Sequence, residues 1–171
     1  MRGQVRRIGR PAVLAIGIVI VVTAAAAAQG SRTDTVRATF VVASQAQLSV
    51  SSATLTFPNR DPDVVTQVTA SEGPLTITVK GHSTVGSAIL LTVQASDDLR
   101  SGVATIAVSA LTWTASGTGF LGGTMSKTAQ TVGSWTTTGN ATGVLAFSFR
   151  NAWTYAAGAY GTTISYTLTV P

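Results

Sequence analysis

An apolar side chain stands at every second position of ISYTLTV, the stretch at residues 164–170. Ile164, Tyr166, Leu168 and Val170 alternate there with serine and threonine. Because successive side chains of a β-strand point to opposite faces of a sheet, this period of two predicts a strand with one buried and one solvated face. Threonine, valine, isoleucine and tyrosine are also residue types that strands favour. The stretch therefore indicates a half-buried β-strand.

Short runs of alternating apolar and polar residues also occur in the preceding part of the chain, and no segment shows a helical period. About nine short runs, separated by glycine, serine, asparagine and aspartate clusters, are expected as strands at residues 36–42, 47–51, 64–70, 75–80, 88–95, 106–114, 132–137, 144–149 and 164–170. We expect residues 75–95 to form a long hairpin with its turn at residues 81–86. The glycine-rich residues 117–123 are expected as a loop or bulge. This spacing predicts an all-β, antiparallel sandwich, with a closed barrel as the alternative.

The first 28 residues carry the features of an export signal. Four arginines precede the apolar residues 12–22, and the small residues 24–28 offer a cleavage site before Gln29. We predict a signal peptide at residues 1–28 and a single domain at residues 29–171, secreted or displayed at the cell surface. A retained anchor is the alternative, because the uncharged run approaches the ~20 residues that cross a bilayer. Contact with a membrane is otherwise expected only before cleavage.

Removing the signal changes the charge of the chain. The sequence has eleven basic and six acidic residues, and four of the basic ones lie in the signal, so that the remainder carries 7 − 6 = +1. Such a chain lacks the basic stripe that phosphate backbones require, and we expect no nucleic-acid partner. It has no cysteine, which excludes disulfides and cysteine-based zinc sites.

The last part of the sequence resembles secreted bacterial sandwich domains. Residues 155–160, YAAGAY, contain a G-x-Y turn that leads into the alternating strand at residues 164–170. This combination resembles spore coat protein U-like and fimbrial-subunit domains, and its Tyr166-Thr167-Leu168 portion also resembles the WxL cell-wall domain. The cysteines common in the coat and pilin domains are absent, and Tyr166 stands where the WxL domain has tryptophan. The resemblance implies an immunoglobulin-like fold and a structural or adhesive surface role, with no catalytic residues.

Apolar residues just after the predicted cleavage site suggest a contact between subunits. Exposed edge strands offer N–H and C=O groups that a strand of another chain can complete. We therefore put forward a donor strand that enters a neighbouring subunit, formed by Val36, Ala38, Phe40 and Val42. The alternative is that this segment is the domain's own first strand. The low charge of the mature chain favours self-association or contact with other surface proteins.

Residues suited to catalysis are scarce in this sequence. His82 is the only histidine, and its place in the KGHS segment is typical of a solvated turn rather than of a Ser-His-Asp triad. Glu72 is the only glutamate, and nothing places an aspartate opposite it as glycoside hydrolysis requires. We expect no enzyme activity and no cofactor.

Two pairs of aspartates are the candidates for calcium, which takes six to eight oxygen ligands. Asp61 and Asp63 lie in PNRDPD, and Asp97 and Asp98 are adjacent. Each pair supplies too few oxygens by itself, and turns select aspartate for their own reasons. We interpret both pairs as turn residues and predict no metal site.

Three aromatic residues support a second function of another class. Trp153 and Tyr155 are two residues apart and would share one strand face, and Trp135 has polar neighbours. If exposed, these rings would stack on sugars and make the domain a carbohydrate- or wall-binding module with a polysaccharide partner. If buried, they belong to the core, with Tyr155 or Tyr160 as a corner tyrosine that bonds to backbone.

Overall fold

The structure is a computed structural model that describes residues 37–171. Residues Phe40–Pro171 form one compact unit, and the predicted signal peptide at residues 1–28 lies outside the described part. Within residues 37–171, every strand pair is antiparallel, so the predicted all-β antiparallel class is confirmed. No helix in this part of the chain is both long and apolar enough to cross a membrane.

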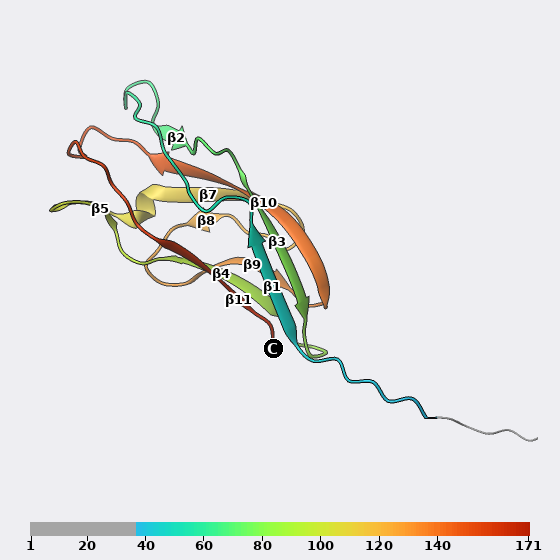
Figure 1. The fold of residues 1–171 in the computed structure, drawn as a ribbon. Helices are drawn as coiled ribbons and strands as arrows, with labels where there is room; N and C mark the ends of the chain where they lie inside the picture. The colour runs from blue at the N-terminus through green and yellow to red at the C-terminus, as the bar shows by residue number, and fades with distance from the viewer. Residues whose placement is uncertain (1–36) are drawn as a thin grey trace, which may run out of the picture. The chain divides into compact units, whose positions relative to one another are not determined.

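Eleven strands and one short 3-10 helix make up the described unit. They are β1 (Gln45–Val50), β2 (Gln67–Thr69), β3 (Leu75–His82), β4 (Ile89–Ala95), β5 (Leu99–Ser101), β6 (Ala104–Ile106), η1 (Val108–Ala110), β7 (Leu111–Ser116), β8 (Gly123–Thr124), β9 (Gln130–Trp135), β10 (Gly139–Arg150) and β11 (Ile164–Thr169). The larger sheet has the order β1-β3-β10-β7-β8, with β2 paired to β10. The smaller sheet has the order β11-β4-β9, and β5 and β6 form a separate hairpin (Figure 1).

One hydrophobic core lies between the two sheets. The alternation that the sequence shows is the cause, because every second side chain of β3 and of β4 is buried. Ile77 and Leu145 from the larger sheet and Leu91 and Val132 from the smaller one are all completely buried in the same cluster. The two sheets therefore stack as in a β-sandwich, with their apolar faces turned towards each other.

One side of this arrangement is closed by residues 117–124. Strand β8 at the end of this segment pairs with β7 of the larger sheet. The same segment reaches the smaller sheet, because Phe120 forms a β-bridge with Gly133 and the Leu121 N–H donates to the Val132 carbonyl at 2.7 Å. We call this the closed side. The loop predicted from the glycines at residues 117–123 thus joins the sheets across their edges.

The predicted hairpin at residues 75–95 is wrong. Strands β3 and β4 do not pair, since β3 lies between β1 and β10 and β4 lies between β11 and β9. The turn between them carries the chain from one sheet to the other. Gly81, near the end of β3, leaves room for the start of β4, because a Cβ atom at this position would stand 2.8 Å from the Ile89 Cδ1 atom.

Two other strand predictions also differ from the structure. The alternation at residues 36–42 forms no strand among the described residues 37–44. The single strand expected at residues 106–114 is divided into β6, η1 and β7. Both buried residues of η1, Val108 and Ala110, belong to the core. The apolar alternation in this segment therefore reflects buried side chains, although the strand is interrupted there.

Candidate functional site

The side opposite the closed side is formed by β1 and β11, the edge strands of the two sheets, which lie next to each other (Figure 1). Within residues 37–171, no strand pairs with the outer edge of either one. Half-buried apolar side chains line it: Leu48, Val50, Ile164, Tyr166, Leu168 and Val170. We call these two edges and their half-buried side chains the open side.

An apolar arm, residues 38–44, leads directly into β1, one of the two edge strands of the open side. The side chains of Phe40, Val41 and Val42 are 87%, 83% and 63% exposed, and the arm has no secondary structure. At its end the Ser44 hydroxyl donates to the Pro171 carbonyl at 3.1 Å. Three consecutive exposed apolar residues are costly in water unless a partner covers them.

Of the four proposed donor residues, the structure describes three. Ala38, Phe40 and Val42 are all exposed, while Val36 lies outside the described residues. The domain's described first strand is β1, which starts at Gln45. The donor-strand prediction is therefore still a proposal, and it now concerns an arm that precedes the first strand.

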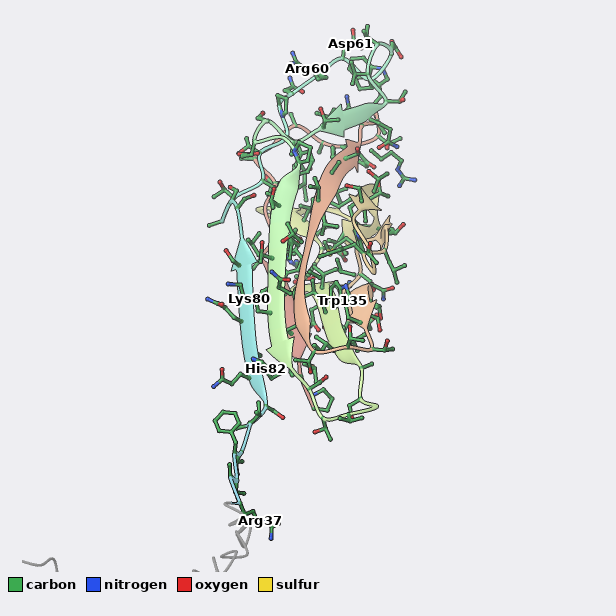
Figure 2. The ribbon with its side chains drawn as sticks, turned by 90° about the vertical axis from the view of Figure 1, so that its right-hand side faces the viewer. Arg37, Arg60, Asp61, Lys80, His82 and Trp135 are labelled. Carbon is green, nitrogen blue, oxygen red and sulfur yellow. The ribbon has the colours of Figure 1, made fainter. Side chains whose placement is uncertain are left out.

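The three proposed sugar-stacking residues do not come together. Trp135 stands at the end of β9 opposite Ile89, where β4 begins. Trp153 hydrogen-bonds to Asp63 in the β1–β2 loop. Figure 2 shows the labelled Trp135 well away from Asp61, which belongs to that same loop. A single binding surface built from all three rings is not present.

Trp135 and Tyr155 are half-buried rings that pack on other aromatic residues. The Trp135 indole N–H donates to the Thr118 carbonyl at 2.9 Å, and its ring meets Phe120 edge to face at 4.9 Å. Tyr155 lies 5.7 Å from Phe149. Both side chains help to hold the domain together, as the core alternative predicts.

Trp153 is different because 70% of it is exposed. Its indole N–H donates to the Asp63 carboxylate at 3.0 Å. The loop that carries Asp63 is itself held, because the Asn151 side-chain amide donates to the Arg60 and Val65 carbonyls. The ring is therefore fixed in orientation while its faces stay accessible.

The corner-tyrosine prediction is confirmed for Tyr160. Its hydroxyl donates to the Ala156 carbonyl at 2.9 Å, four residues upstream. This bond ties down the connection that leads from β10 of the larger sheet to β11 of the smaller one. Tyr155 makes no such bond among the described residues and packs on Phe149 instead.

The aspartates serve turns and ion pairs. Asp61 accepts the Asp63 N–H, as a turn aspartate does. Asp98 accepts the Val108 N–H at 3.0 Å and pairs with the Lys127 ammonium at 2.7 Å, and Asp97 pairs with Arg100 at 2.7 Å. Among the described residues, no three His, Cys, Asp or Glu side chains gather where they could hold a metal ion.

These contacts make the stability of the domain sensitive to acid. The Asp98 N–H and then the Arg100 side chain hold the pKa of Asp97 below its usual 3.8. Lys127 and then the Val108 N–H lower the pKa of Asp98, and the Thr56 backbone N–H lowers that of Glu72. A carboxyl group whose pKa is lower in the folded chain stabilises it above the unfolded pKa and loses this effect as the pH falls through the folded pKa.

We therefore expect the urea concentration at the midpoint of unfolding to decrease as the pH is lowered from about 5 to about 2. The double change Asp97→Asn and Asp98→Asn removes two of the three groups, so its midpoint should depend less on pH across this window. Urea unfolding followed by tryptophan fluorescence at several pH values checks this. An unchanged dependence in the variant would mean that other groups dominate.

Tyr166 on β11 carries a buried hydroxyl without a hydrogen-bond partner among the described residues. Burial raises the pKa of Tyr166 above its ordinary 10.0. Replacement by phenylalanine removes an unsatisfied polar atom, so we expect Tyr166→Phe to unfold with equal or higher free energy, by up to about 1 kcal/mol. Because a raised phenol pKa gives stability that is lost as the pH rises, the variant should also lose less stability above about pH 10. A clear loss at neutral pH would reveal a partner for the hydroxyl.

His82 and Glu72 are both surface residues in this unit. His82 is the exposed last residue of β3, where it pairs with Gln45 (Figure 2). The Glu72 carboxylate accepts the Thr56 N–H at 2.7 Å, a contact that fixes the β1–β2 connection.

Sequence reasoning missed the open side, because the sequence pattern does not show which strands become edges. No protein-family model and no curated protein matches this chain.

Proposed function

We propose that this chain is an exported, non-enzymatic structural or adhesive surface protein that works as a subunit of an extracellular assembly, such as a coat or a pilus-like fibre. The observation that carries the proposal is the combination of an apolar exposed arm with an open side. The arm has apolar side chains to cover, and the open side has strand edges to complete. Association of two copies can bury the apolar side chains of the arm and complete the strand edges of the open side.

An immunoglobulin-like sandwich is the finer description of the fold that we propose. Three features support it. The first strand, β1, is an edge strand, the connection from β3 to β4 crosses between the sheets, and the Tyr160 hydroxyl bonds to backbone at the corner before β11. Domains of this architecture present loops and edges rather than a central pocket.

The arm is the element that we propose as a donor strand. Ala38, Phe40 and Val42, together with Val36, would add to a strand edge of a neighbouring copy and place their side chains against its half-buried apolar row. Main-chain hydrogen bonds would supply affinity, and alternate side chains would supply specificity.

Size-exclusion chromatography and negative-stain imaging of residues 29–171 test the assembly. A ladder of oligomers or a fibre supports the proposal, and a monomer at all concentrations contradicts it. Deletion of residues 30–44 then tests the arm. We expect a folded protein that no longer forms a ladder or a fibre, because residues 37–44 contribute no strand to the domain; an unfolded product would mean that the segment is required for the fold.

Point variants give a matched control for the deletion. Phe40→Ser with Val42→Ser should abolish the ladder and the fibre. Val85→Ser with Val103→Ser changes two side chains that are fully exposed outside the arm, and should leave the assemblies intact. Equal effects from both pairs would show that surface hydrophobicity in general, and not the arm, drives association.

A glycan-binding module is the second candidate function, and Trp153 is the observation that favours it. An exposed indole in fixed orientation is a suitable platform for a sugar ring. Titration of the folded protein with soluble polysaccharides should then quench tryptophan fluorescence. The response should vanish in Trp153→Ala and persist in Trp135→Phe; no response from the folded wild type would rule this function out.

A further inference from the structure

The outer edge of β11 is one of the two strand edges on the open side. β11 pairs with β4 along its whole length, without a register shift. On the far edge of the smaller sheet, β9 is covered by the closed side through the Phe120 bridge to Gly133. Among residues 37–171, β11 is thus the uncovered edge of the smaller sheet.

The direction of its free backbone groups follows from the bonds that β11 makes. The Thr163 carbonyl accepts the Ser96 N–H at 2.8 Å, so residue 163 faces β4. In an antiparallel pair, residues alternate between facing the partner and facing away. Ser165, Thr167 and Thr169 therefore direct their N–H and C=O groups towards β4, while Ile164, Tyr166 and Leu168 direct theirs to the outside.

This edge carries none of the features that keep natural sheet edges apart. Proteins commonly protect an edge with a lysine, another charge, a proline or a bulge. β11 has the sequence ISYTLT, and neither β4 nor β9 contains a charged residue either. The whole smaller sheet is uncharged, so a second strand meets no repulsion and no buried charge when it approaches.

The strand is also complementary to itself. Residues 164–170 alternate symmetrically about Thr167, with apolar side chains at positions one and three residues to either side. When two copies are related by a two-fold axis at Thr167, Tyr166 of one lies opposite Leu168 of the other and Ser165 lies opposite Thr169. All of the outward backbone groups then meet outward groups. Cross-strand pairs of threonine with threonine or serine, as at residues 167 and 165/169, are favourable in sheets.

We propose that β11 pairs antiparallel with β11 of a second copy, with Thr167 on the two-fold axis, so that the two smaller sheets form one continuous six-stranded sheet. A contact of this kind is isologous and closes as a dimer. The inference deepens the proposed function by naming one contact between copies, and it leaves the edge of β1 to the donor arm.

A single cysteine tests the pairing, because the chain contains none of its own. In the proposed register, the two Thr167 residues form a pair without mutual hydrogen bonds, whose Cα atoms are about 4.5 Å apart. That separation suits a disulfide. Thr167→Cys should therefore give a disulfide-linked dimer on mild oxidation, at least about ten times more than Thr76→Cys, an exposed threonine on β3 within the larger sheet. Equal yields from the two variants would overturn the proposal.

A mixture of cysteine variants separates this contact from one with the arm. If Thr167→Cys links mainly to Val42→Cys rather than to itself, the edge of β11 accepts the arm and the self-pairing is wrong. If Thr167→Cys links mainly to itself in the mixture, the pairing of the two β11 strands is supported.

A charged edge gives an independent test that requires no oxidation. Ser165→Lys with Thr167→Lys brings like charges together across the two-fold axis, so the dimer measured by sedimentation should weaken at least about tenfold. The control, Thr76→Lys with Thr114→Lys, adds the same charge at exposed positions of the larger sheet and should not change it. Wild-type assemblies that persist unchanged in the β11 variant would overturn this inference while the proposed function stands, whereas a wild type that is always monomeric would overturn both.

Discussion

Ile77→Ala is expected to lower the free energy of unfolding by about 2–5 kcal/mol, the largest effect of a single substitution that we anticipate. Ile77 is completely buried on β3 and belongs to the core between the sheets. Truncation removes apolar contacts and leaves a cavity that strands held from both sides cannot easily fill. Because the domain has no disulfide to compensate, such a loss approaches the whole stability of an ordinary domain.

Urea or guanidinium unfolding followed by circular dichroism measures this effect. The matched control is Val103→Ala, an aliphatic truncation at a fully exposed position in the β5–β6 turn, which should change the free energy by less than about 0.5 kcal/mol. If both variants lost the same amount, the core assignment would be wrong.

Gly143→Ala is expected to cost about 1–3 kcal/mol by the opposite mechanism, overpacking. A Cβ atom at this position on β10 would collide with the ring of Phe120. That ring cannot move freely, since it is buried and meets Trp135 edge to face at 4.9 Å. The substitution therefore acts on the closed side, where Phe120 bridges to β9.

Two comparisons isolate the cause of the Gly143 effect. Gly161→Ala adds the same methyl group where nothing lies within 4 Å, and should be nearly neutral. In a Phe120→Ala background, Gly143→Ala should cost much less than in the wild type, because the ring with which it collides is gone; such non-additivity is the signature of residues in contact. A full cost in that background would point instead to the backbone of β10.

The strands could be predicted from the sequence where alternation and burial coincide. Residues 75–80, 88–95 and 164–170 each show apolar side chains at every second position. Each became a strand, with a buried face in β3 and β4 and a half-buried face in β11. A corner tyrosine was expected at Tyr155 or Tyr160, and the structure assigns the backbone bond to Tyr160.

Strand partners could not be predicted in the same way. A period of two shows which face is buried and is silent about the neighbour on either edge, so the β3–β4 hairpin was expected where a crossing between sheets occurs. The arm shows the reverse problem. Phe40 and Val42 have the spacing of a strand, but within the described residues nothing covers them. A strand-like sequence pattern does not form a strand unless another segment pairs with it.

The candidate site could be predicted only in part from the sequence, for the same reason. The orientation of the exposed Trp153 and the partial burial of Trp135 depend on Asp63 and Phe120, which lie 90 and 15 residues away along the chain. The unguarded edge of β11 follows from the sheet order, which no local run of residues encodes. The sequence thus indicated which residues could take part in the site, and the pairing of distant strands decided where they lie.

The uncharged smaller sheet has a consequence for the conditions in which copies would hold together. Ionic strength weakens attraction between exposed charges by screening, but pairing through β11 involves no charges to screen. Raising sodium chloride from about 0.1 M to about 1 M should leave that contact unaffected, whereas sulfate, which strengthens apolar burial, should tighten it. An assembly built this way would keep its cohesion from dilute water to brine.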